Sequence, residues 1–475
     1  MARDPGVRGL WRGHRAPAEE TPAWREAVGF RYRTPYRYYS LAKVGFALAY
    51  LWYVWDFFRI HAACRGDLPL LLPDPRYVAL TGSPSLDAVL RPIAVFLNRP
   101  PVVACFAVVA PIAAGLFLWG RRKWLQVAVG GWMSFSMIAL NCLLGVFSST
   151  VDVWLNLNFV IYALAAAVTP ADEWDRAEPG LSPARWHTNP TLCSTFAWLV
   201  VWLQFLVYFF AGVNKLVLGW VPWTSGVALQ NLAIDSSMRD FVRGVPVPFW
   251  ISLVLCYVTL LQRLVVPWGF FFRRWRLWSV LILGTMHLGY ALLMNVNLFP
   301  LIGIAALLMI LPPRQPESPS LAPAPLGGWG AKAVVGLFAL ALALESARLT
   351  HFRPAPWENK LMVTPSWRMF ADGGVAAGGE WRVILVSPRQ GIDGTEFPLA
   401  ALPHLWRDRF YINNIFNDLM NRDMGPGSLV DRLGRATRIL YREREIAQGL
   451  APSFVGVGFE LYRWSPTAGS ASARP

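Results

Sequence analysis

The sequence predicts a mainly α-helical, polytopic membrane protein, a bundle of about nine transmembrane helices with a small C-terminal α+β domain outside the membrane. Of its 475 residues, 55% are apolar and only 15% are charged, whereas about a quarter of a soluble globular chain is charged. Apolar blocks recur through the first three quarters of the chain, and each has the roughly 18–25 residues needed to cross a bilayer core of about 30 Å. This composition excludes disordered, collagen-like and small disulfide-scaffold proteins.

Nine apolar segments are the predicted spans. They cover roughly residues 40–60, 101–120, 124–148, 153–169, 193–216, 248–272, 277–295, 297–312 and 331–349. They divide the chain into a basic cytoplasmic segment (1–39), a transmembrane domain (40–349) and an extracytoplasmic α+β domain (350–475).

The net charge of +15 is distributed in a way that predicts orientation. Residues 1–43 hold nine Lys or Arg against four Asp or Glu, and the clusters Arg121–Lys123 and Arg273–Arg276 lie in short loops between spans. By the positive-inside rule, these regions are cytoplasmic and the C-terminal domain lies outside, in a multi-pass protein of the cell membrane. The sequence lacks the basic stripes interleaved with aromatic residues that nucleic-acid binding requires, so the predicted partner is the lipid bilayer.

The predicted elements outside the spans are short. Residues 86–97 and 220–248 are amphipathic and suited to the membrane surface. In the C-terminal domain, 380–386 and 455–464 are rich in β-forming residues and predict strands, and 404–447 predicts helix.

Polar residues in the fifth span form the most informative pattern. Gln204, Tyr208, Ala211 and Lys215 follow a spacing of i, i+4, i+7 and i+11, which places them on one helical face. The small pair Ala211–Gly212 lets a neighbouring helix or a ligand approach closely. Two interpretations of Lys215 stay open, a desolvated neutral base or an anchor that extends to the outer interface.

Other ionisable residues in the spans have structural and functional interpretations. Asp56 and Arg59 are three residues apart and predict an ion pair within the first span. His287, in an apolar helix, is either a hydrogen-bonded packing residue or a catalytic residue. The sequence contains no metal-ligand cluster, phosphate-binding glycine loop or Ser-His-Asp arrangement, so we expect no bound metal.

The run Tyr208–Leu216, YFFAGVNKL, followed by Trp220, resembles the signature of the vitamin K-dependent gamma-carboxylase family and its bacterial relatives, the horizontally transferred transmembrane (HTTM) proteins. Three further segments resemble that family in order along the chain. They are Asp56 with Arg59, His287 followed by 297–303, and 366–370.

The resemblance implies that Lys215 is the base that deprotonates a reduced quinone, similar to vitamin K hydroquinone, and that His287 is also catalytic. It further implies that Gln204, Tyr208, Asn214 and Trp220 contact this cofactor. The reaction would be carboxylase-like, a lyase or ligase reaction coupled to hydroquinone epoxidation, on an exported polypeptide or small molecule.

Departures from the family keep the function open. Residues 154–159 lack the histidine that the carboxylase carries in its fourth span, and the sixth span contains Gln262–Arg263. The alternative is a non-catalytic or transport protein of the HTTM family, or one that matures a peptide toxin. A transporter would be expected to show internal hydropathy repeats, and their lack favours an enzyme.

The predicted topology places Asp393 outside the cell. A cysteine introduced at Asp393 should therefore react with a membrane-impermeant thiol reagent added to intact cells. Protection of that cysteine until the cells are lysed would mean that the number of spans before it is even, not odd.

Overall fold

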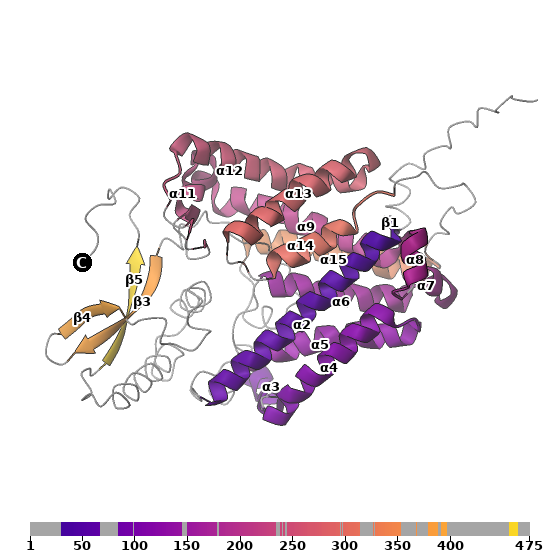
Figure 1. Ribbon diagram of the computed structural model, residues 1–475, viewed down its shortest axis with the longest axis horizontal. Helices are drawn as coiled ribbons and strands as arrows, with labels where there is room; N and C mark the ends of the chain where they lie inside the picture. Colours follow the sequence, from indigo (N-terminus) through magenta and orange to yellow (C-terminus); the bar gives the residue numbers. More distant parts are fainter. Residues whose placement is uncertain are drawn as a thin grey trace, which may run out of the picture.

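The computed structural model describes most of the helical part of the chain and three strands near its end. The described residues are 30–66, 84–97, 99–144, 150–177, 180–233, 238–239, 241–242, 245–294, 296, 298–313, 326, 328–352, 367, 379–387, 391–396 and 456–463. Within the first 352 residues the long helices pack side by side as a bundle (Figure 1).

Six helical segments in the described residues are long and apolar enough to cross a membrane. They are α4 (Pro100–Trp119), α6 (Thr150–Val168), α9 (Thr195–Leu218), α12 with the following 3₁₀ helix η1 (Phe249–Leu264 and Val266–Phe271), α13 (Arg273–Leu293) and α15 (Trp329–His351). Twenty helical residues rise about 30 Å, which matches the hydrocarbon thickness of a bilayer.

Helices also coincide with the other three predicted spans, but these helices differ from the six. They are α2 (Tyr36–Gly66), α5 (Lys123–Leu144) and α14 (Phe299–Leu308). The ten residues of α14 rise about 15 Å, which is half the thickness of the bilayer core. α2 and α5 have the length, but Tyr, Trp, Ser, Lys43 and Gln126 interrupt their apolar runs. The described chain is therefore a mainly helical membrane protein with six candidate spans, and a total of about nine stays a prediction.

A short antiparallel ladder joins two distant parts of the sequence. Strand β1 (Tyr32–Pro35) pairs with β2 (Thr191–Ser194), and each strand leads directly into a long helix, α2 and α9 respectively. The Tyr32 hydroxyl lies 3.2 Å from the carbonyl oxygen of Phe270 and 3.1 Å from that of Ile310, at the ends of η1 and α14. The ladder thus fixes the beginnings of α2 and α9 against the rest of the bundle.

The amphipathic segments predicted outside the spans are helical where they are described. Helix α3 (Pro84–Leu97) covers the first of them, and α10 (Trp220–Ser225) and α11 (Val227–Ala233) begin the second. Gly226 separates α10 from α11 with φ 85°, a conformation that glycine adopts without steric cost. Between α6 and β2 lie two further short helices, α7 (Ala171–Ala177) and α8 (Pro183–Thr188).

Both predicted C-terminal strands are present. β3 (Gly379–Ser387) lies between β4 (Gly391–Glu396) and β5 (Gly456–Arg463) in an antiparallel three-stranded sheet. The helix predicted over 404–447 lies outside the described residues, so an α+β domain stays a prediction.

Helices α2 and α14 approach each other at a glycine. A Cβ atom built on Gly45 would lie 2.6 Å from the Cβ of Ala305, closer than two carbon atoms can pack. Gly131 in α5, in contrast, has no heavy atom within 4 Å of such a Cβ.

Gly45→Ala should lower the thermal unfolding midpoint, because the added methyl group must push α14 away from α2. Overpacking of this kind costs about 1–3 kcal/mol. Gly131→Ala is the matched control and should raise the midpoint, since Ala in an open helical position is favoured by about 0.4–1 kcal/mol. Tryptophan fluorescence of both variants in nanodiscs measures the two midpoints, and equal midpoints would show that the α2–α14 contact is not tight.

Candidate functional site

Helix α9 carries the polar stripe that the sequence predicts. Gln204 and Tyr208 are fully buried, and Ala211 and Lys215 are 5% and 3% exposed. The Oγ of Ser194 accepts a hydrogen bond from the Ala197 N–H at the start of the helix, and the helix ends at Gly219. The stripe therefore faces protein along about three turns.

Tyr208 and His287 are brought together by the packing of α9 and α13. The Tyr208 hydroxyl lies 2.6 Å from Nε2 of His287, and both side chains are fully buried. Which atom donates depends on the tautomer of the imidazole ring. The other ring nitrogen, Nδ1, is buried and has no hydrogen-bond partner in the described structure. One nitrogen of His287 is thus hydrogen-bonded, and the other is buried without a described partner.

A glycine in α14 makes room for the His287 ring. A Cβ built on Gly303 would lie 2.2 Å from Cε1 and 2.3 Å from Nε2 of that ring, so no larger residue fits at this position. Two aromatic rings complete the surroundings, with centroids 6.1 Å (Trp154) and 4.9 Å (Phe299) from that of His287. The imidazole is held by packing on several sides as well as by its hydrogen bond.

Arg263 is a further member of this group and was not among the predicted site residues. It comes from α12, is 4% exposed, and its Nη2 donates a hydrogen bond of 2.9 Å to the Tyr290 hydroxyl. Its guanidinium carbon lies 5.6 Å from the centroid of the Tyr208 ring. We call Tyr208, Arg263, His287 and Tyr290 the central cluster. The sequence does indicate Arg263, because placing an arginine within an apolar span costs free energy, and such a residue is therefore a candidate for a functional role.

Gly212 allows α12 to bring Arg263 close to α9. A Cβ built on Gly212 would lie 2.8 Å from the Cβ of Arg263 and 2.9 Å from Cδ2 of Leu264. The predicted role of the Ala211–Gly212 pair, close approach of a neighbour, is confirmed, and the neighbour is a helix.

Lys215 lies against a tryptophan of α10 that was not among the predicted site residues. Its Nζ is 4.5 Å from the centroid of the Trp223 ring, and Trp223 is 1% exposed. Trp220, to which the resemblance assigns contact with a cofactor, is 58% exposed. The aromatic surface beneath Lys215 therefore comes from the second tryptophan of α10. We call these two residues the Lys215–Trp223 pair.

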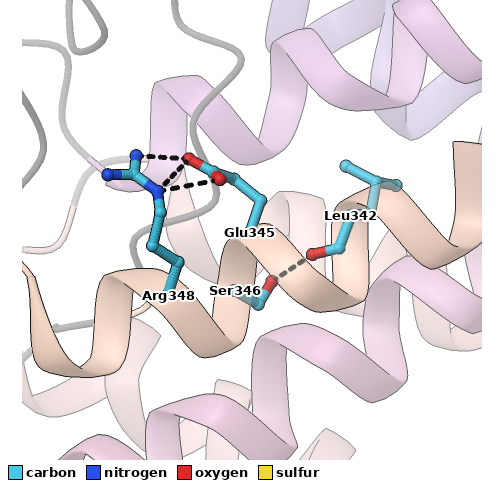
Figure 2. Close-up of polar contacts among 4 residues, drawn as sticks. All are labelled: Leu342, Glu345, Ser346 and Arg348. Atoms are coloured by element: carbon cyan, nitrogen blue, oxygen red, sulfur yellow. Dashed lines mark hydrogen bonds and ion pairs between the residues drawn. The ribbon is translucent and has the colours of Figure 1, made fainter.

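Asn214 connects α9 to the chain beyond α15. Its Nδ2 donates a hydrogen bond of 3.0 Å to the carbonyl oxygen of Trp367, whose indole Nε1 donates one of 3.1 Å to Ser346 Oγ. Ser346 in turn donates to Leu342 O within α15, beside the Glu345–Arg348 ion pair (Figure 2). The amide nitrogen of Asn214 is thus used structurally, and its buried Oδ1 has no partner in the described structure.

Gln204 is the residue of the stripe whose buried polar atoms lack described hydrogen-bond partners. It is fully buried, and neither Oε1 nor Nε2 has a hydrogen-bond partner among the described residues. An unmade hydrogen bond of a buried polar group costs about 1–3 kcal/mol, so such groups call for a partner. Gln204, Asn214 and His287 together offer unpartnered buried donor or acceptor atoms.

Other predicted features lie elsewhere or outside the described chain. The side chain of Arg59 is outside the described residues, so the Asp56–Arg59 ion pair stays a prediction. A hollow of about 180 Å³ lies near the start of α2, lined by Pro35, Arg37, Tyr38, Leu41, Trp186 and Asn189, none of which is a predicted site residue. Within the described part of the chain, no three His, Cys, Asp or Glu side chains are grouped so that they could hold a metal ion.

Comparison with known proteins places this site in a family domain. Residues 146–314 match the family model of the HTTM domain. No curated protein and no solved structure matches the chain. The matched segment runs from the start of α6 to the end of α14, so it contains the stripe on α9, the central cluster and the Lys215–Trp223 pair. The match covers about a third of the chain, and this region is similar to the HTTM domain.

Proposed function

We propose that the HTTM domain of this chain is a membrane-embedded enzyme site that acts on a reduced quinone, with Lys215 as the base, and that it modifies an exported polypeptide or small molecule. The resemblance of Tyr208–Leu216 to the carboxylase signature suggests the reaction class. The observation that carries the proposal is the burial of Lys215 inside the protein.

Burial of Lys215 favours a base over an interface anchor. An anchoring lysine lays its stem along apolar surface and keeps its ammonium group in water. Lys215 is instead 3% exposed, and its Nζ lies over the ring of Trp223. A lysine enclosed by protein in this way is in a position to act on a bound ligand, which an anchor at the interface is not.

The residues of the domain fit a reduced quinone. A quinol carries hydroxyl groups on a flat apolar ring, and Gln204, Asn214 and His287 each have a buried polar atom without a partner among the described residues. Gln204 and Asn214 are ten residues apart on α9, about 15 Å along the helix, so one quinol would reach only one of the two. Trp154 lies beside the His287 ring and Trp223 beneath Lys215, so each predicted catalytic residue has an aromatic neighbour. When bound, a reduced quinone supplies an ionisable hydroxyl group and two electrons.

The Tyr208–His287 hydrogen bond would hold the second catalytic residue in one orientation. With Nε2 paired to the Tyr208 hydroxyl, only Nδ1 of His287 is left to take up or donate a proton. The ring also lies so close to Gly303 that a Cβ atom there would overlap it, which limits the room for the ring to move. Gln204 would position a ligand from the same face of α9.

Lys215→Ala and Lys215→Arg should each lower the rate of quinol oxidation by about 10²–10⁴-fold, the usual contribution of a general base. Arginine fails like alanine because a guanidinium group does not give up its proton. The measurement is oxygen uptake with vitamin K hydroquinone by the protein in nanodiscs, over the rate with empty nanodiscs.

Lys332→Ala is the matched control, since Lys332 is also a lysine beside a tryptophan, with its Nζ 5.8 Å from the Trp329 ring, but that ring is 89% exposed. It should keep the rate of the unsubstituted protein. Full activity in Lys215→Arg, or no oxidation above background in the unsubstituted protein, would contradict the assignment. Mass spectrometry of the protein purified with native lipids should detect a bound quinone.

Tyr208→Phe should lower quinol oxidation about tenfold or more while the protein still folds, because the change removes one hydroxyl group and leaves Nε2 of His287 without its hydrogen bond. Loss of a partner from a buried polar atom costs about 1–3 kcal/mol. The thermal midpoint and the oxidation rate are measured together, and Tyr257→Phe is the control, because the Tyr257 hydroxyl donates to Thr224 O at an exposed position. An unchanged rate in Tyr208→Phe would remove His287 from the site.

A further inference from the structure

The buried charged residues that the structure describes are all basic. Among the residues that the structure describes, five basic side chains are buried and no aspartate or glutamate is. They are Arg31, Lys43, Lys215, Arg263 and Arg276. Arg31 is paired with the partly buried Glu173, Lys43 donates to the Tyr162 hydroxyl, and Arg276 donates from Nε to the Phe270 carbonyl.

Arg263 has only uncharged partners in the part of the chain that the structure describes. Of its guanidinium N–H groups, one donates to the Tyr290 hydroxyl, while the buried Nε has no partner in the described structure. Two ring faces lie near the guanidinium carbon, Tyr208 at 5.6 Å and Tyr290 at 5.9 Å. The groups that α9 and α13 bring to it are therefore phenols, aromatic rings and the imidazole of His287, without a carboxylate among the described residues.

The contacts of Arg263 do not offset the free-energy cost of burying its charge. A cation–π contact is a weak interaction, whereas the removal of an ion from water is costly even after the protein relaxes. Lysine or histidine can escape this cost by losing a proton, but a guanidinium group stays charged. The close helix contact at Gly212 holds the start of this side chain against α9. An anion between α9, α12 and α13 would supply the missing compensation.

We infer that Arg263 binds the oxyanion headgroup of an amphiphilic ligand within the membrane-spanning part of the HTTM domain. A planar guanidinium group with free N–H donors matches the two or three oxygens of a carboxylate or phosphate group. The outward surfaces of α12 and α13 are apolar, with Val258 39%, Leu261 60% and Leu288 52% exposed, so the body of the ligand is apolar as well. This inference does not depend on Lys215 being a base.

The test is equilibrium binding to the full chain in phosphatidylcholine nanodiscs, without quinone or turnover. The probes are decanoate and decyl phosphate, with uncharged decanol as the reference, and binding is followed by tryptophan fluorescence against empty nanodiscs. At least one oxyanionic probe should bind tenfold or more tightly than decanol, and the better of the two identifies the headgroup as carboxylate or phosphate. Since no quinone is present, failure here leaves the proposal for Lys215 untouched, and the reverse also holds.

Variants assign the binding to Arg263. Arg263→Gln should weaken binding of the oxyanionic probe at least tenfold and leave decanol unchanged, and Arg263→Lys should fall between. Arg276→Gln is the matched control, because Arg276 is also buried and lies 4.0 Å from a tyrosine ring centroid, but its Nε has a carbonyl partner. It should bind the probe as the unsubstituted chain does.

Two results would overturn the inference, namely no preference for either oxyanion over decanol, or equal binding by Arg263→Gln. If Arg263→Gln does not fold, solid-state NMR decides the question. A contact between the labelled headgroup atom and a ¹⁵N-labelled guanidinium group should be present in the unsubstituted chain and lost in Arg263→Lys. Its absence from the unsubstituted chain contradicts the inference.

Discussion

Two close helix contacts, each made possible by a glycine, hold the candidate site together. At Gly212 the α12 backbone comes near enough to α9 that the Cβ of Arg263 occupies the space of a missing side chain, and at Gly303 the imidazole of His287 does the same against α14. In a bilayer, lipid tails are as apolar as leucine, so helices associate through such close packing and through hydrogen bonds between them. The same contacts that assemble the bundle thus place its ionisable groups in the interior.

The sequence pattern predicted much of this arrangement, because helical geometry is regular over short distances. Spacing alone placed Gln204, Tyr208 and Lys215 on one face of α9, and all three are buried. It could not predict which tryptophan lies under Lys215, since that depends on how α10 turns back from α9 after Gly219. Trp223 is buried there and Trp220 is exposed. Only the three-dimensional packing separates the two.

Contacts between residues on helices far apart in the sequence were the second feature that could not be predicted. Arg263 was visible as a charge in an apolar span, but its relation to Tyr208 and Tyr290 depends on three helices meeting at one level. The strands β1 and β2 were not predicted, because four residues carry too weak a pattern to be recognised outside a sheet. The number of spans was uncertain for a similar reason: the aromatic and polar residues that give α2 and α5 their contacts also lower their hydropathy.

The ladder between β1 and β2 has a consequence for biosynthesis. Tyr32 pairs with Ser194, more than 150 residues later, and the Tyr36 N–H donates to the carbonyl oxygen of Pro190. Contacts of such long sequence separation form late, because the intervening chain must first be made. During synthesis α2 is made while its leading strand is still unpaired, and α4, α5 and α6 are made before β2. The ladder can form only when the segment before α9 has emerged from the ribosome. A nascent chain that stops short of residue 191 therefore has an unpaired strand edge, which chaperones and proteases can recognise.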